Sequence, residues 1–282
     1  MRLQFIDVAH IIYRKPDYKE LPKMISSREI SRDLLLEYLN TLLKPEIFDD
    51  YCPNGLQIEG KTKIVKIAFA VSATVDSIEK AIQEHADALI VHHGLFWKFH
   101  GPKTITGPFA KRVKPLIEHN INLFGYHLPL DGHLEIGNAA RLAKRLGMTT
   151  LQPFGAGKMH GSFMGVKGQL ATHAQALAEI LEKTVQHPVM LATPSPSKRI
   201  TSIGIITGGA NSQWQLALKD GLDAYITGEM SEHDWHEARE SDIVMLAGGH
   251  HATERFGIQA LMAKVEEQFN VPCVFIDSEN PA

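Results

Sequence analysis

The feature of this chain that most constrains its fold is an internal correspondence between two stretches that lie 136 residues apart. Residues 66–94 (KIAFAVSATVDSIEKAIQEHADALIVHHG) align without a gap on residues 202–230 (SIGIITGGANSQWQLALKDGLDAYITGEM), and Asp87 falls on Asp223. Each stretch shows the pattern of a buried strand, a helix and a second strand. Such a repeat predicts an internal duplication that forms two similar α/β units, with a cleft where their strand ends face each other.

Strands alternate with helices along most of the chain, and this alternation predicts an α/β fold with mostly parallel sheets covered by helices. Residues 64–71 form a nearly continuous apolar run, which is typical of a strand buried on both faces. Residues 148–200 differ because they are rich in glycine and contain the stretch TPSPSK near their end. The sequence therefore predicts four segments: an N-terminal extension (1–23), a first α/β unit (24–147), an inserted α+β segment (148–200) and a second α/β unit (201–282).

The composition is that of an ordinary globular protein, with 44% apolar and 22% charged residues in a chain of 282. The formal net charge of −3 gives no basic excess that would indicate nucleic-acid binding. Only Cys52 and Cys273 are present, which excludes a disulfide framework and fits the reducing cytoplasm. No run approaches the ~18 consecutive apolar residues of a membrane span. Residues 1–23 also lack the features of a signal peptide, so we expect a cytoplasmic protein.

Candidate metal ligands follow the predicted strands, at the sheet edge where parallel sheets bind their ligands. His92 and His93 come directly after a buried strand and precede Gly94, a residue that lets the chain turn. Because neighbours on a strand point to opposite faces, both imidazoles could reach one metal pair only if the chain turns there. The alternative is that they are two loop histidines, one in solvent and one packed.

Two further pairs combine a histidine with a carboxylate four residues later. His127 and Asp131 lie in YHLPLD, which we expect to be a loop because Pro129 favours an extended path. The alternative is a turn that Asp131 caps. His250 and Glu254 lie in GGHHATERFG at the start of a predicted helix, where this spacing puts both side chains on one face. The alternative there is an ordinary surface pair.

Together these residues supply four imidazoles and two carboxylates, more than one tetrahedral metal ion needs. They are enough for two divalent ions bridged by a carboxylate and water, an arrangement that activates water for hydrolysis. Nitrogen and oxygen ligands accept zinc, iron, manganese, nickel or cobalt, so the sequence leaves the metal open. The predicted metal ligands are His92, His93, His127, Asp131, His250 and Glu254.

Several other residues near the predicted strand ends are weaker candidates. Glu229 takes the second-unit position of His93, and we assign it a catalytic role in proton transfer; the alternatives are a carboxylate in water or a structural ion pair. Residues 207–209 (TGG) could hold an anion on backbone N–H groups or form a tight glycine turn. The histidines expected to lie on the surface or beside the site are His133, His233, His236 and His251.

Short motifs also give the chain a resemblance to a known family. These motifs are NGLQIEG (54–60), VHHGLFW (91–97), YHLPLD (126–131), TGEMSE (227–232), GGHHATERFG (248–257) and the terminal NPA. They resemble the Nif-three-like family, which carries the legacy label GTP cyclohydrolase 1 type 2 homologue. The similarity runs from about residue 28 to the end and is closest to the short bacterial members.

The resemblance implies two similar α/β domains with a dinuclear metal site between them. It also implies a homohexameric toroid whose metal sites face an inner cavity. The family's metal-binding positions carry over to His92 and His93, to His127 and Asp131, and to His250 and Glu254.

Two classes of function remain open at this point. The one we favour is a metal-dependent hydrolase that acts on a nucleotide or related purine, as the family label suggests for a GTP cyclohydrolase-like enzyme. The alternative is a non-catalytic metal-binding scaffold or a ring that binds protein partners, because no separate nucleophile or substrate motif can be named. Both include two divalent metal ions per chain.

Overall fold

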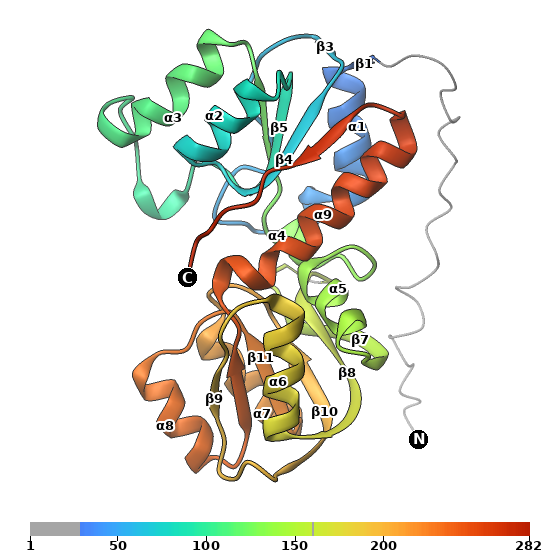
Figure 1. Cartoon of the computed structure of the whole chain (residues 1–282), viewed down its shortest axis with the longest axis vertical. Helices are drawn as coiled ribbons and strands as arrows, with labels where there is room; N and C mark the ends of the chain where they lie inside the picture. Colours follow the sequence, from blue (N-terminus) through green and yellow to red (C-terminus); the bar gives the residue numbers. More distant parts are fainter. Residues whose placement is uncertain (1–28, 160) are drawn as a thin grey trace, which may run out of the picture.

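The computed structural model describes residues 29–159 and 161–282, so the predicted extension (1–23) lies outside the described residues. Within them the chain forms two main sheets covered by helices, and a short pair of β1 (Ile30–Ser31) and β3 (Lys63–Ile64) (Figure 1). The first sheet contains, in spatial order, β13 (Cys273–Phe275), β4 (Ile67–Ser72), β5 (Ala88–His93), β6 (Asn122–Gly125) and β2 (Gly55–Ile58). The second contains β7 (Thr149–Ala156), β8 (Phe163–His173), β10 (Arg199–Ile205), β11 (Ala224–Thr227), β12 (Val244–Ala247) and β9 (Met190–Ala192).

Helices cover both faces of each sheet, and each sheet with its helices is called a unit below. In the first unit, α1 (Arg32–Leu43) packs on one face, while α2 (Val75–Gln83) and α3 (Gly107–Glu118) pack on the other. In the second, α5 (Asn138–Arg145) and α6 (Ala174–Val185) cover one face, and α7 (Trp214–Lys219) and α8 (Glu232–Glu240) the other. Short helical segments lie at Pro45–Ile47 (η2), Lys98–His100 (η3), Leu128–Asp131 (α4) and Asn211–Gln213 (η4). None of the described helices is long and apolar enough to cross a membrane.

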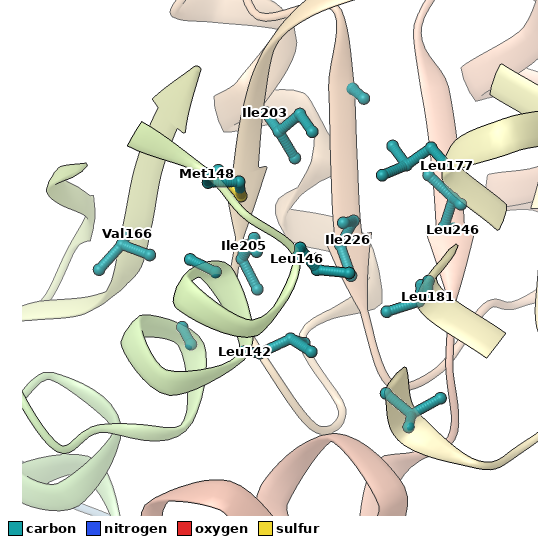
Figure 2. Packing of buried hydrophobic residues seen from close by; sticks show 14 of the residues in the cluster. Leu142, Leu146, Met148, Val166, Leu177, Leu181, Ile203, Ile205, Ile226 and Leu246 are labelled. Atoms are coloured by element: carbon teal, nitrogen blue, oxygen red, sulfur yellow. The ribbon is translucent and has the colours of Figure 1, made fainter. Parts of the chain in front are cut away.

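Both sheets are buried on two faces, as the continuous apolar runs predict. In β4, Phe69 points toward α1, whereas Ala68 and Ala70 point toward α2 and α3. Figure 2 shows the larger core of the second unit, where Leu142 of α5 lies near Ile205 and Ile226 of the sheet. The strand ends are therefore held by two layers of packed side chains, which gives functional groups at those ends a rigid base.

The predicted α/β fold is confirmed, but the sheets are mixed rather than mostly parallel. In the first sheet only β2 runs antiparallel to its neighbour. In the second sheet β10, β11 and β12 are parallel, whereas β7, β8 and β9 pair antiparallel. The segment predicted as an insert (148–200) supplies these antiparallel strands, and the short connection from β7 to β8 can only join antiparallel neighbours.

The strand register of the first sheet recurs in the second. Residues that lie opposite one another in β4 and β5 have counterparts 136 positions later that lie opposite one another in β10 and β11. The equivalent triplets across three parallel strands are Ile67, Ala88 and Asn122 in the first sheet and Ile203, Ala224 and Val244 in the second. The carboxyl ends of β5 and β11 therefore hold equivalent places in their sheets.

The chain crosses to the other unit after the third strand of each triplet. After β6, α4 leads into α5, which packs on the second sheet. After β12, α9 (His250–Phe269) begins against the second core with Phe256 and ends in the first core with Leu261 and Val265 (Figure 1). The strand β13 then pairs with β4. The elements of each unit therefore do not coincide with the sequence ranges 24–147 and 201–282. The helix α9, with 20 residues, spans roughly 30 Å and takes the chain from the second unit to the first.

Candidate metal centre

All six predicted metal-ligating residues lie together where the two units meet. His92 and His93 end β5, His127 precedes α4 and Asp131 ends it, and His250 and Glu254 occupy the start of α9. Their nitrogen and oxygen atoms form three groups, each with all its ligand atoms within 4.8 Å of one another. The groups are His92–His93–His127, His93–His250–Glu254 and His92–Asp131–Glu254. Each group could hold a metal ion, and any two of the three groups have one residue in common.

The segment from His127 to Asp131 is a helical turn and not the loop that we predicted from Pro129. Pro129 lies in the first turn of α4, where a backbone N–H has no intrahelical partner to lose. A helical turn brings residues four apart to the same side of the chain. The short helix therefore presents His127 and Asp131 together.

Glu254 is at the centre of the cluster and is only 3% exposed. Its Oε2 atom lies 3.1 Å from Nε2 of His93 and 3.2 Å from Nε2 of His250, while Oε1 lies 3.5 Å from Nε2 of His92. Burial alone raises the pKa of this carboxyl, but the neighbouring imidazoles outweigh burial and lower the pKa well below its usual value. The side chain is therefore an ionised carboxylate that offers one oxygen to each side of the cluster.

All four imidazoles are fixed through their Nδ1 atoms, which leaves each Nε2 toward the cluster. A ligating histidine usually has its second nitrogen bonded in this way, which sets the tautomer and the ring orientation. The Nδ1 contacts are His92 to the Tyr126 carbonyl at 3.1 Å, His93 to Ser72 Oγ at 2.9 Å, His127 to Asp50 Oδ1 at 2.7 Å and His250 to Glu229 Oε1 at 2.5 Å. The two carboxylates and the carbonyl can only accept, so the rings of His92, His127 and His250 donate from Nδ1.

Two buried atoms of the cluster have ion-pair contacts but no hydrogen bond of good geometry. Nε2 of His92 lies 3.5–3.6 Å from the carboxylates of Glu254 and Asp131, and Oε2 of Glu254 lies 3.1–3.2 Å from two imidazoles, yet neither atom forms a hydrogen bond. A buried polar atom without a partner costs free energy, and a cation bound between these lone pairs would satisfy both. The donor set of imidazole nitrogen and carboxylate oxygen suits a first-row divalent ion. The residues present therefore fit a bound metal.

Burial and charge act in opposite directions on the imidazoles. Burial lowers the pKa of the His92 ring, but Asp131 and Glu254 outweigh it and raise the pKa to about 9. Burial also lowers the pKa of His250, and Glu254 raises it to about 9. For His93 burial dominates and the pKa falls to about 4. The metal-free cluster therefore carries protons on His92 and His250 at neutral pH, while His93 is neutral.

Metal affinity is expected to fall as the pH falls, because an incoming ion must displace protons from His92 and His250. Both imidazoles have a pKa of about 9 without metal, so each displaced proton weakens binding roughly tenfold per pH unit below that value. Zinc titrations against a competing chelator at about pH 7 and about pH 8 should differ roughly ten- to hundredfold in affinity. An affinity independent of pH would show that these two rings do not lose protons to the metal.

A cavity of about 460 Å³ opens beside the cluster. Its size falls within the range of small-molecule sites. The residues of the cluster that line it are His93, His127, Asp131, His250 and Glu254, and His92 lies behind them. A ligand in this cavity would therefore contact the metal-binding face directly.

Glu229 lies behind His250 rather than in the wall of the cavity. Its carboxylate accepts the hydrogen bond from Nδ1 of His250, and its side chain is 51% exposed. This contact orients the ring of a candidate metal ligand. A role for Glu229 in proton transfer stays a prediction.

The weaker candidates lie apart from the metal-binding groups or have other partners. Nδ1 of His133 accepts from the backbone N–H groups of Glu135 and Ile136, and His251 contacts Asp277 at 3.2 Å. His233 and His236 are exposed on α8, as predicted for surface histidines. In the glycine turn 207–209, the N–H of Gly208 donates to Thr253 Oγ1 at 3.2 Å, so this group already has a partner.

Several residues of the site gave no signal in the sequence. Asp50 accepts hydrogen bonds from His127 Nδ1, from the backbone of Leu128 and from Asn54, although it lies 77 positions before His127. Asn138 donates to Asp131 Oδ1 at 2.9 Å and accepts from the N–H of Gly257 at 2.7 Å, which joins α5, α9 and a metal-binding carboxylate. Only the placement of Asp50 just before the NGLQIEG motif could have drawn attention to it.

Comparison with known proteins identifies relatives along most of the chain. A family model described as Duf34/NIF3 (NGG1p interacting factor 3) matches residues 30–281. A relative from Pasteurella multocida (strain Pm70), named GTP cyclohydrolase 1 type 2 homolog, is 43% identical over 250 residues, which cover 88% of this chain and 98% of the relative. The solved structure of protein ybgI, of unknown function, has a TM-score of 0.83 at 37% identity and covers 90% of this chain and 100% of its own. That of TTHA1606 from Thermus thermophilus has a TM-score of 0.80 at 33% identity, again with 90% of this chain and 100% of its own.

Proposed function

This chain belongs to the Duf34/NIF3 (NGG1p interacting factor 3) family, and we propose that it is a metal-dependent hydrolase with two divalent ions between its units. The proposed substrate is a nucleotide or a related purine. The observation that carries the proposal is the convergence of six metal-binding side chains from both units beside a cavity of about 460 Å³. His/carboxylate clusters in such cavities are typical of metal-assisted hydrolysis.

The arrangement of ligand atoms supports two ions rather than one. Three overlapping groups of ligand atoms exceed the four positions of a single tetrahedral ion. Glu254 directs Oε1 toward His92 and Oε2 toward His93 and His250, as a carboxylate that bridges two ions would. The carboxylate of Asp131 lies on the His92 side, 3.6 Å from Nε2 of that ring.

The residues around the cluster would hold and orient it during the reaction. Bound divalent ions supply Lewis-acid polarisation and lower the pKa of water. Asp50 and Glu229 hold the Nδ1 protons of His127 and His250, which keeps the Nε2 lone pairs toward the cluster. Glu229 reaches solvent, and we assign to it the proton transfer between the site and bulk water.

The purine substrate is supported by the name that curated relatives bear, GTP cyclohydrolase 1 type 2 homolog. A cyclohydrolase of this type opens a purine ring by hydrolysis. The further elements of the proposal are an internal duplication, which the recurring strand register supports, and a homohexameric ring, which only the family resemblance implies. A cytoplasmic location is proposed from the low cysteine content.

The test is turnover by protein loaded with zinc, manganese or iron. We expect hydrolysis of GTP or a related purine nucleotide, detected as a new product by chromatography and mass spectrometry. Asp131→Ala should abolish turnover, because Asp131 belongs to one of the three ligand groups. Equal turnover by that variant would contradict the catalytic role. A fully metallated protein that turns over no member of a purine panel would favour a non-catalytic metal-binding protein.

A further inference from the structure

An aromatic wall stands over the metal-binding face of the cavity. Tyr51, Trp97 and Phe99, all from the first unit, line the cavity. The rings of Trp97 and Phe99 are stacked, with centroids 5.4 Å apart and an interplanar angle of 28°. The Trp97 ring also meets His127 edge-on at 5.1 Å and donates from Nε1 to the Gly94 carbonyl at 3.1 Å. The wall is therefore held in position directly beside a metal-binding imidazole.

The outer part of this wall is largely exposed, although Nζ of Lys158 lies over the Tyr51 ring. Phe99 is 67% exposed and Tyr51 is 44% exposed. Exposed aromatic rings that adjoin one another at a cavity mark a binding site more often than an isolated exposed ring does. A flat ligand placed on the stack would bury these faces and gain contact area without moving the chain.

The opposite wall comes from the second unit and carries no charge. Its residues lie in β8 and between positions 206 and 213, and they include Thr207, Ser212 and Gln213. Among the described residues that line the cavity, none is lysine or arginine. Lys98 and Lys158 share one carboxylate, Asp49, at the rim, where Nζ of Lys158 lies 4.9 Å from the centre of the Tyr51 ring. The side chains of this wall offer hydrogen bonds and flat apolar contact, so cationic groups are confined to the metal-binding side of the cavity.

We propose that the cavity recognises a planar, uncharged heteroaromatic ring of purine size, stacked on Trp97 and Phe99 with its edge toward the metal-binding residues His93 and His127. This inference rests on the proposed function and assigns recognition to the ring of the substrate rather than to its phosphates. Thr207, Ser212 and Gln213 face the ring from the other side and supply hydrogen bonds to its polar edge. Phe99 is then a residue that determines specificity.

The test uses zinc-loaded full-length protein and two probes, guanosine and ribose 5-phosphate. Guanosine should bind, as measured by calorimetry, and should quench the fluorescence of Trp97. Phe99→Leu should weaken guanosine binding roughly 5- to 150-fold, the range for loss of one stack between a base and an aromatic ring, whereas Phe99→Tyr should retain it. Ribose 5-phosphate should bind more weakly and should not respond to Phe99→Leu.

Control variants separate stacking from folding and from metal binding. Trp97→Phe should remove the fluorescence response, because the other tryptophans, Trp214 and Trp235, lie outside the cavity wall. Trp235→Leu removes an aromatic ring on α8 and should leave guanosine binding unchanged. Zinc content, measured by elemental analysis, should be the same in every variant.

Three results would overturn the inference: no binding of guanosine, an equal affinity for ribose 5-phosphate, or an unchanged guanosine affinity in Phe99→Leu. Its failure can be told apart from failure of the proposed function. Ring binding that depends on Phe99, without turnover of any purine nucleotide, contradicts the hydrolase and keeps the ring site. Turnover of a purine nucleotide at a rate that Phe99→Leu leaves unchanged supports the hydrolase and contradicts the ring site.

Discussion

The Glu254→Gln variant is expected to lose nearly all of its bound metal while remaining folded. Glu254 belongs to two of the three ligand groups, and its oxygens face imidazoles from both units. Glutamine has almost the same shape but replaces one acceptor oxygen with an NH₂ donor, which cannot ligate a cation. Loss of residues that only support ligands typically costs 10- to 100-fold in metal affinity, so loss of this carboxylate should cost at least about 100-fold.

Elemental analysis of protein purified without added metal measures the effect, and thermal melting with and without zinc gives a second readout. A ligand at about 1,000 times its Kd stabilises the folded state by roughly 4 kcal/mol. For a chain of this size that corresponds to a rise in Tm on the order of 10 °C, which Glu254→Gln should lack. The matched control is Glu267→Gln, an exposed position on the same helix. A Glu254→Gln protein that keeps its full metal content would show that the ions lie elsewhere.

The clustering of the six candidate ligands could be anticipated from the sequence because each belongs to a local pattern near the end of a strand. A strand, a short turn and a His or carboxylate can be recognised within about ten residues, and parallel strands bring their carboxyl ends to one edge. The motifs also predicted the family, which the match over residues 30–281 confirms. The structure then brings these positions together, since β5 ends in His93 and α9 begins at His250.

The exchange of helices between the units could not be predicted in this way. A helical pattern reports that one face is apolar, but it does not report which sheet that face covers. In α9, Phe256 packs in the core of the second unit and Val265 in that of the first, so one helix serves both. The partner of His127 was missed for a related reason, because Asp50 reaches it across 77 positions of sequence. Contacts between residues so far apart depend on the whole fold and produce no periodic pattern in the sequence.

The Gly208→Ala variant is expected to bind metal at least about tenfold more weakly than the unchanged protein. Its stability should fall by little more than the backbone cost of an alanine at this position. A Cβ at this position would clash with Oε1 of Glu254 and would lie 3.0 Å from Nε2 of His250. The loop cannot retreat, because the N–H of Gly208 is bonded to Thr253 and its carbonyl to Gly228. The Glu254 side chain can move instead, and its displacement would relieve the clash. The cost of the clash should therefore appear in metal affinity, measured by chelator competition, while the melting temperature of the metal-free protein should fall only by the backbone cost of a left-handed alanine.

Gly221→Ala provides a control with the same backbone geometry. Gly208 has a φ of +68° and Gly221 a φ of +67°, so an alanine incurs a similar backbone cost of about 1–2 kcal/mol at either position. A Cβ on Gly221 meets no atom within 4 Å, which leaves the position of Glu254 as the difference between the two variants. If both variants lose equal stability and only Gly208→Ala loses metal, the bound ion depends on where the Glu254 carboxylate lies. If both retain metal equally, the bound ion does not depend on the position of the Glu254 carboxylate, which contradicts this prediction.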